Sequence, residues 1–206
     1  MPVHPFDNGE MLIRDELLAP WPRTEQEIRK QLRDYYAVIT GLDYHIGRLL
    51  AALKDLKLDD NTIIIFASDN GLSLGSHGLM GKQNLYEEGT KVPLIFAGPG
   101  IAAGRSDALV YLMDIFPTVC DLVNIPVPAG LDGKSLKPVI DRREPGVRST
   151  LFTAYRDVQR AIRDDRWKLI RYPKINKTQL FDLKDDPDEM HDLAGDPAQA
   201  GRIERM

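Results

Sequence analysis

Two short apolar runs, separated by a glycine-rich stretch, set the strongest limit on the fold. The first run, 62–68 (TIIIFAS), is continuous and rich in β-branched residues, and the second is 92–97 (VPLIFA). Such runs are typical of strands buried on both faces, as in a parallel sheet covered by helices. Pro93 favours an edge position or a strand start. A long connection between buried strands is uncommon unless it serves a site, so residues 69–91 become the candidate functional segment.

A long amphipathic helix is predicted before the first run. Thr24 and Glu27 have the spacing of a capping box, which indicates a helix start. Apolar residues then recur in steps of three and four, on one helical face. They are Ile28, Leu32, Tyr35, Ile39, Leu42, Ile46, Leu49 and Leu53. The chain before Pro22 is interpreted as an irregular lead-in.

The second half of the chain has a different pattern. Asp114 is expected to cap a short helix that contains Cys120, and the Pro- and Gly-rich stretch 125–146 indicates a boundary. Short strands are predicted at 150–155, 160–163, 167–172 and 179–183, with a hairpin turn at Asp164–Asp165 and a final helix opening at 186–189. We therefore predict an α/β layer, residues 1–125, followed by a small antiparallel α+β subdomain, residues 126–206.

Composition excludes several classes of protein. The 206 residues are 43% hydrophobic and 28% charged, with a net charge of −4, which excludes a generally basic nucleic-acid binder. No apolar stretch has the length of a membrane span. The N-terminal sequence has acidic residues where a signal peptide needs a basic and an apolar region, and it leaves the localisation open. The single cysteine, Cys120, excludes an internal disulfide and a cysteine-rich zinc site.

Asp69 and Asn70 are the first candidate site residues, because they directly follow the first apolar run. Ligands of open α/β sheets bind at the carboxyl ends of strands. Two adjacent oxygen-bearing side chains there can share a hard cation such as Ca²⁺ or Mg²⁺. Gly71 permits a sharp turn after them. The alternative is an ordinary turn, since Asp-Asn-Gly is a common turn sequence.

His77 and Lys82 are the next candidates in the same stretch. His77 lies between glycines, in the segment Gly75–Gly78, and could approach an anion or a leaving group. Lys82 could bind an anionic substrate and neutralise developing charge. Taken one at a time, each is better explained as a surface residue, a loop histidine and a solvated lysine.

The order of these motifs resembles the signature of the sulfatase family, in the alkaline-phosphatase superfamily. The matching segments are SDNG, GSHG, GK, YEE and KVPLI, in that order. The segment YYAVITGLDYHIGRLLAAL resembles the helix that precedes this signature in the family, and QLFDLKDDPDEMHDLA resembles its closing strand and helix. The resemblance extends over most of the chain, and several motifs in order are far more specific than Asp-Asn-Gly alone.

The resemblance implies a fold and a set of roles. The chain would be the C-terminal part of an alkaline-phosphatase-like sandwich. Asp69 and Asn70 match two ligands of the catalytic divalent cation, which is usually Ca²⁺, with Mg²⁺ as the alternative. Lys82 matches the lysine that contacts the sulfate group, and His77 falls in the family's Gly-x-His-Gly segment near the substrate. The expected substrate is a sulfated small molecule or glycan.

One part of the family's machinery has no counterpart in this sequence. Sulfatases use a formylglycine made from the first residue of a Cys/Ser-x-Pro-Ser-Arg motif, and no such motif occurs here. Cys120 is followed by Asp121 and Leu122, so we reject it as the nucleophile. We therefore expect a fragment that is inactive alone, and a sheet that is short of strands and prone to self-association.

Two alternatives remain open at this point. The first is a phosphodiesterase or a phosphonate monoester hydrolase of the same superfamily, because the resemblance implies the same use of a metal ion and a lysine in these enzymes. The second is a non-catalytic remnant or interaction module, which the missing nucleophile favours. The presence of Asp69, Asn70, His77 and Lys82 in order argues against long decay.

Overall fold

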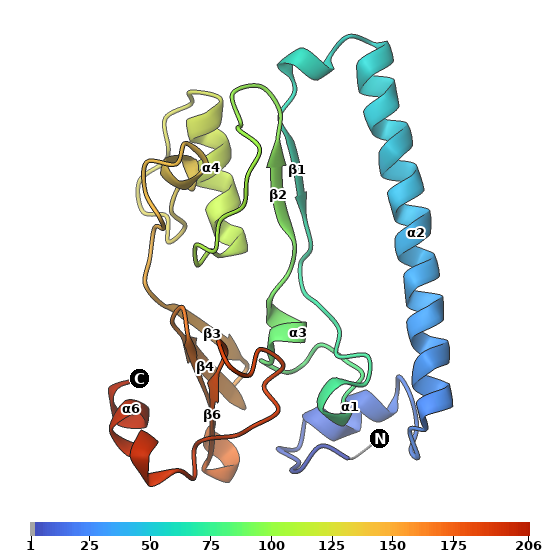
Figure 1. Ribbon diagram of the computed structural model, residues 1–206, viewed down its shortest axis with the longest axis vertical. Coiled ribbons are helices and arrows are strands. Elements are labelled where there is room, and N and C mark those ends of the chain that lie inside the picture. Colours follow the sequence, from blue (N-terminus) through green and yellow to red (C-terminus); the bar gives the residue numbers. More distant parts are fainter. Residues whose placement is uncertain (1–2) are drawn as a thin grey trace. The chain divides into compact units, whose positions relative to one another are not determined.

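The computed structural model describes residues 3–206, so the first two residues of the predicted lead-in and first domain lie outside it (Figure 1). The chain forms two compact units. One contains the chain up to Asn84 together with Glu88–Gly100, and the other contains Leu85–Glu87 and Ile101–Met206. This is a different division from the predicted domains 1–125 and 126–206, which stay a prediction.

The long helix of the first unit is confirmed. Helix α2 spans Glu25–Asp55, and the side chain of Thr24 accepts a hydrogen bond from the amide of Glu27, 3.2 Å away. The lead-in before it is not wholly irregular, because it contains a short helix, α1, at Met11–Glu16. Local capping chemistry therefore fixes where α2 begins, as the sequence predicts.

The apolar stripe of α2 is only partly covered. Ile28, in its first turns, packs with Ala19 and Met80, and Leu32 and Leu74 lie against this cluster. Farther along the stripe, Ile39, Leu42 and Leu49 are exposed. Tyr35, Ile46 and Leu53 are half-buried. Full burial of a stripe residue therefore occurs only near the N-terminal end of the helix.

The two apolar runs form strands, but the expected parallel sheet is wrong. Strand β1, Ile64–Ala67, pairs antiparallel with β2, Leu94–Ala97, and Ile64 is opposite Ala97 (Figure 1). The expectation of burial on both faces is also wrong, because Ile95 is 55% exposed. The reason lies in the connection, which returns on itself instead of crossing over the sheet as a parallel pair requires.

The second unit is built on a four-stranded antiparallel meander. Its strands are β3 Leu151–Tyr155, β4 Gln159–Arg163, β5 Trp167–Tyr172 and β6 Lys177–Asp182, in that order across the sheet. Arg163 is opposite Lys168, so the predicted hairpin at Asp164–Asp165 is confirmed. Trp167, Leu169 and Leu180 form a buried cluster, with Ile203 and Met206 against it.

Short helices complete the chain. They are α3 Glu87–Thr90, α4 Ile115–Leu122, α5 Lys137–Ile140 and α6 Ala200–Arg205, with 3₁₀ turns at Asp59–Asn61, Ser76–Gly78, Leu112–Asp114, Pro173–Ile175 and Pro197–Gln199. Cys120 lies in α4, as predicted, and the structure shows that it is buried.

The final helix does not open at 186–189. Asp186 instead accepts hydrogen bonds from the amides of Met190 and His191, and Glu189 has a left-handed backbone with φ 54°. That backbone conformation cannot continue a right-handed helix. The helix that ends the chain, α6, therefore begins at Ala200.

Asp114 precedes α4, but its side chain does not cap that helix. It is fully buried and receives two hydrogen bonds from Arg148, at 2.5 and 2.6 Å, and one each from the amides of Tyr111 and Lys134. Burial by itself would raise the pKa of Asp114, but the hydrogen bonds from Arg148 and the two amides outweigh it and lower the pKa. This cluster ties the start of α4 to the chain entering β3.

Replacing Asp114 by Asn in this chain is expected to lower the free energy of unfolding at pH 7 by about 3–5 kcal/mol, because Arg148 loses its buried counter-charge. The loss should shrink on acidification. A carboxylate with a lowered folded-state pKa contributes stability above its unfolded-state pKa, about 3.9, and loses it as the pH falls through the folded-state value. Urea unfolding at pH 7 and pH 3 measures both effects.

The matched control is Asp107→Asn, since Asp107 pairs with Arg105 at 3.7 Å with both side chains about nine-tenths exposed. This variant should unfold like the parent protein at either pH. An Asp114→Asn variant as stable as its control would show that the buried pair contributes nothing.

Candidate functional site

Asp69 and Asn70 lie where the sequence predicts, directly after β1. The amide of Asn70 donates to the carboxylate of Asp69 at 3.0 Å, and the hydroxyl of Ser68 donates to the carbonyl oxygen of Asn70 at 3.0 Å. The residue Asp69 is exposed and Asn70 is half-buried. A carboxylate and an amide oxygen on adjacent residues of such a turn have the chemistry that a hard cation prefers.

Gly71 holds the two ends of the candidate segment together. Its amide donates to the carbonyl oxygen of Gly89 at 3.1 Å. A Cβ atom at Gly71 would lie 1.8 Å from the carbonyl oxygen of Glu88, a distance that no side chain can occupy. Only glycine therefore allows this closure, and the residue that follows the candidate cation ligands is fixed by packing.

The middle of the segment folds as a second, tighter return. Three backbone hydrogen bonds define it: Ser73 to Gly81 at 3.1 Å, Leu74 to Met80 at 3.4 Å, and Gly75 to Leu79 at 2.7 Å. Gly81, which directly precedes Lys82, is thereby paired with Ser73, three residues beyond Asn70. The Lys82 residue itself is exposed.

His77 sits at the tip of this return with a left-handed backbone, φ 55°, between Gly75 at φ 107° and Gly78 at φ 73°. A left-handed backbone at a histidine costs free energy, so this conformation persists only where the surrounding structure holds it. Its Nε2 lies 3.7 Å from a carboxylate oxygen of Glu88, and its side chain is 8% exposed. The His77 side chain is therefore mostly buried, unlike the surface histidine of the alternative interpretation.

Asn84 completes the support of the return. Its buried side-chain amide donates to the hydroxyl of Ser73 at 2.9 Å and to the carbonyl oxygen of Gly81 at 3.3 Å. Asn84 thus holds both strands of the return, on either side of His77 and next to Lys82. Sequence reasoning missed this residue, because nothing in the Gln-Asn-Leu context marks a buried asparagine.

Two residues of the lead-in were also missed. Asp15, in α1, and Arg23, before α2, form a buried ion pair at 2.9 Å. Both contact the return between His77 and Lys82 through its backbone. The sequence carries no periodicity or motif that would have identified them.

Leu85–Glu87, which follow Asn84, belong to the second unit and are held by its sheet. Lys168 is buried and its ammonium group lies 3.0 Å from Glu87 and 2.9 Å from Glu189, while Arg163 pairs with Glu87 at 2.7 Å. Burial raises the pKa of Glu189, and the charge of Lys168 opposes that rise. Glu87, from the YEE segment of the signature, is thus a member of a largely buried charge cluster.

The neighbouring Tyr86 is anchored by a polar contact. Its hydroxyl donates to the side-chain oxygen of Gln179 at 2.9 Å, and Tyr172 donates to the same oxygen at 2.9 Å. Burial raises the pKa of both phenols, so they stay protonated and act as donors.

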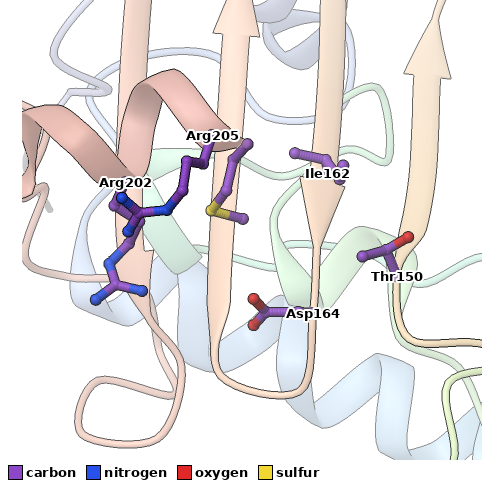
Figure 2. A pocket seen from close by; sticks show the side chains of 6 residues that line it. Thr150, Ile162, Asp164, Arg202 and Arg205 are labelled. Atoms are coloured by element: carbon purple, nitrogen blue, oxygen red, sulfur yellow. The ribbon is translucent and has the colours of Figure 1, made fainter.

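A separate pocket of about 230 Å³ lies in the second unit (Figure 2). Its lining residues are Thr150, Ile162, Asp164, Arg202, Arg205 and Met206. The Asp164 carboxylate already accepts hydrogen bonds from the amides of Arg166 and Trp167, and the guanidinium of Arg202 stacks 3.7 Å over the Trp167 ring. These groups are used in packing the hairpin and α6, and the pocket contains none of the predicted site residues.

Comparison with known proteins identifies two matching family models. Residues 13–125 match the model described as Sulfatase, and residues 75–206 match the model described as N-sulphoglucosamine sulphohydrolase, C-terminal. A choline-sulfatase of Rhizobium meliloti is 38% identical over 180 residues, which cover 84% of this chain and 35% of that protein. The chain thus spans about a third of the length of this relative.

Solved structures agree in fold. A protein solved in complex with its substrate, D-glucosamine-2-N,6-O-disulfate, superposes with a TM-score of 0.81 at 32% identity, covering 92% of this chain and 42% of that one. A phosphonate monoester hydrolase from Silicibacter pomeroyi gives a TM-score of 0.80 at 28% identity, covering 88% and 40%. The predicted alkaline-phosphatase-like fold class is therefore confirmed.

Among residues 3–206, no helix combines the length and the hydropathy that crossing a bilayer requires.

Replacing Gly71 by Ala is expected to lower the free energy of unfolding by about 1–3 kcal/mol, because the new methyl group must displace backbone and not a flexible side chain. The control is Gly41→Ala in α2, where no atom lies within 4 Å of an added Cβ. That change should raise stability by about 0.5–1 kcal/mol, since alanine is the better helix former. Thermal unfolding of both variants tests the closure, and an unchanged melting temperature for Gly71→Ala contradicts it.

Proposed function

Because the chain belongs to the sulfatase family, we propose that it carries the cation- and sulfate-binding half of a sulfuric ester hydrolase site. The observation that supports this most is the closed segment 69–91. Glycine-dependent contacts and a buried ion pair hold the backbone beside Asn70, His77 and Lys82, although an ordinary surface loop would need no such restraint. The substrate would be a sulfated small molecule or glycan.

In this proposal Lys82 binds the sulfate group of the ester. Its exposed ammonium group can reach a ligand and stabilise negative charge that develops on the transferring group. His77, with Nε2 beside Glu88, can hold a proton at that atom near the leaving oxygen. We give His77 the supporting role and Lys82 the principal one.

Asp69 and Asn70 would hold a divalent cation, Ca²⁺ in our proposal, with Mg²⁺ as the alternative. The donor set fits a hard cation, since both residues offer oxygen atoms from one exposed turn. A bound cation would supply positive charge against the sulfate oxygens. Six or more oxygens normally surround such an ion, so these two residues would be only part of its shell.

The nucleophile is not proposed within these residues. Cys120 is buried in α4 and lacks the formylglycine motif around it. We therefore propose that the 206 residues are inactive by themselves, and that a formylglycine completes the site in the intact enzyme.

A phosphonate monoester hydrolase or phosphodiesterase is the second candidate. It is favoured by the structural similarity to the hydrolase of Silicibacter pomeroyi. A tetrahedral oxyanion needs the same cation and lysine in both reactions. A non-catalytic module is the third candidate, and it predicts that the candidate residues have no effect on any hydrolysis.

Replacing Lys82 by Ala in the complete gene product is expected to lower kcat/KM for an aryl sulfate about 10²–10³-fold, because one preorganised charge is lost. Lys91→Ala is the control, since Lys91 is also an exposed lysine of the same segment, and it should keep the parent rate. Removal of divalent cations with a chelator should abolish the activity, and Ca²⁺ should restore it. Hydrolysis of an aryl phosphonate ester in preference to the sulfate selects the second candidate. No hydrolysis of either ester, with intact folding, selects the third.

We also propose that an isolated copy of this chain pairs with a second copy through its truncated sheet. Strands β1 and β2 form a sheet of only two strands among the described residues, so each has an open edge, and Ile95 in β2 is 55% exposed. Sedimentation velocity of the 206-residue chain should therefore show a dimer or larger species. Ile95→Glu should return it to the monomer, and a monomeric parent chain contradicts the proposal.

A further inference from the structure

The lead-in contributes a buried ion pair to the candidate segment. The guanidinium Nη1 of Arg23 lies 2.9 Å from Oδ2 of Asp15, and the exposed fractions of the two side chains are 0% and 5%. Arg23 also donates from Nε to the carbonyl oxygen of Ala19, at 2.9 Å. The pair is thus a fixed, desolvated unit and not a surface contact.

Three further hydrogen bonds of this pair go to the turn between His77 and Lys82. Arg23 Nη1 donates to the carbonyl oxygen of Gly78 at 2.6 Å. Asp15 accepts from the amide of Met80 at 2.5 Å and, with its other oxygen, from the amide of Gly81 at 2.6 Å. Gly78 directly follows His77, and Gly81 directly precedes Lys82.

The approach of Asp15 depends on glycine at position 81. A Cβ atom there would lie 2.7 Å from Oδ1 of Asp15 and 3.4 Å from a methyl group of Leu18. Met80, beside it, is 3% exposed and packs with Ala19 and Ile28. Polar and apolar contacts therefore fix the same four-residue turn from both sides.

Stability alone is a weak reason for such a pair. Burying two charges costs desolvation that the attraction between them often only balances. The pair does restrict the orientation of the turn. Both carboxylate oxygens of Asp15 accept from consecutive amides, and the guanidinium of Arg23 donates to a carbonyl oxygen, so only one orientation of the turn satisfies all three hydrogen bonds.

We propose that Asp15 and Arg23 are positioning residues that set where Lys82, and with it His77, meets a sulfate ester, an inference that rests on the proposed function. Neither residue touches the substrate. They act by holding the backbone at Gly78 and at Gly81, so that the backbone from which the Lys82 side chain extends has a fixed position.

The test uses Asp15→Asn and a double-mutant cycle with Lys82→Ala in the complete gene product. Asp15→Asn is expected to lower kcat/KM for an aryl sulfate about 10–100-fold, mainly through kcat. In the Lys82→Ala background the same change should have almost no further effect, because a residue that acts through Lys82 cannot act when Lys82 is gone. Independent losses that multiply overturn the proposal, as does an Asp15→Asn variant with the parent rate.

A second readout needs no activity. Amide hydrogen exchange at Met80 and Gly81 in the 206-residue chain should accelerate at least about 10-fold in Asp15→Asn, because one acceptor of a charge-assisted bond is lost. Exchange within β5 should stay as in the parent chain. Unchanged exchange at both amides overturns the proposal even where the activity assay fails.

Two further variants separate positioning from misfolding. Gly81→Ala keeps the ion pair and pushes the turn away from Asp15, so it should also lower kcat. Glu10→Gln removes the carboxylate of a more exposed pair, with Arg14 in α1, and should leave kcat unchanged. If Lys82→Ala itself has the parent rate, the proposed function fails, and the exchange measurement still decides whether Asp15 holds the turn.

Discussion

The closure of the segment 69–91 on itself governs the rest of the first unit. The amide of Gly71 meets the carbonyl oxygen of Gly89, and the absence of a Cβ lets the chain ends come this close. That contact turns the connection between β1 and β2 into a long hairpin, so the strands pair antiparallel. It also leaves the candidate cation ligands at the end of β1, and it confines His77 and Lys82 to one return of the chain. Fold and candidate site therefore share a single backbone constraint.

Buried ion pairs restrain irregular segments of the chain in three places. Asp15 with Arg23 holds the return in the first unit, and Asp114 with Arg148 holds the start of α4 in the second. Lys168, between Glu87 and Glu189, holds Leu85–Glu87 to the meander. Each joins an irregular segment to a helix or strand, where apolar packing alone would allow sliding. Directional contacts of charged groups are well suited to that task, because they fix an orientation even when their net contribution to stability is small.

Local signals predicted the elements, and long-range contacts decided what the sequence could not show. Thr24 and Glu27 fixed the start of α2, and turn residues with β-branched runs located the meander, because those preferences act within a few residues. The direction of β2 depended on Gly71 meeting Gly89, and the missing helix at 186–189 depended on the left-handed backbone of Glu189 and its pairing with Lys168. In the same way, the order of motifs named Asp69, Asn70, His77 and Lys82. The residues that restrain them, Asp15, Arg23 and Asn84, carry no local pattern, so only the folded chain reveals them.

The similarity to both a sulfatase and a phosphonate monoester hydrolase is consistent with the part of a reaction that we propose for this chain. In our proposal Lys82 and a cation on Asp69 and Asn70 act on the transferring group, a tetrahedral centre with charged oxygens in either reaction. Neither the lysine nor the cation distinguishes sulfur from phosphorus, since both respond to the charge and the position of the oxygen atoms. A closed segment that fixes those charges can therefore be kept while the leaving group and the nucleophile change. Selection between the two esters must then act on groups that contact the rest of the substrate, and the restraint by Asp15 and Arg23 is expected to be equally useful in both enzymes.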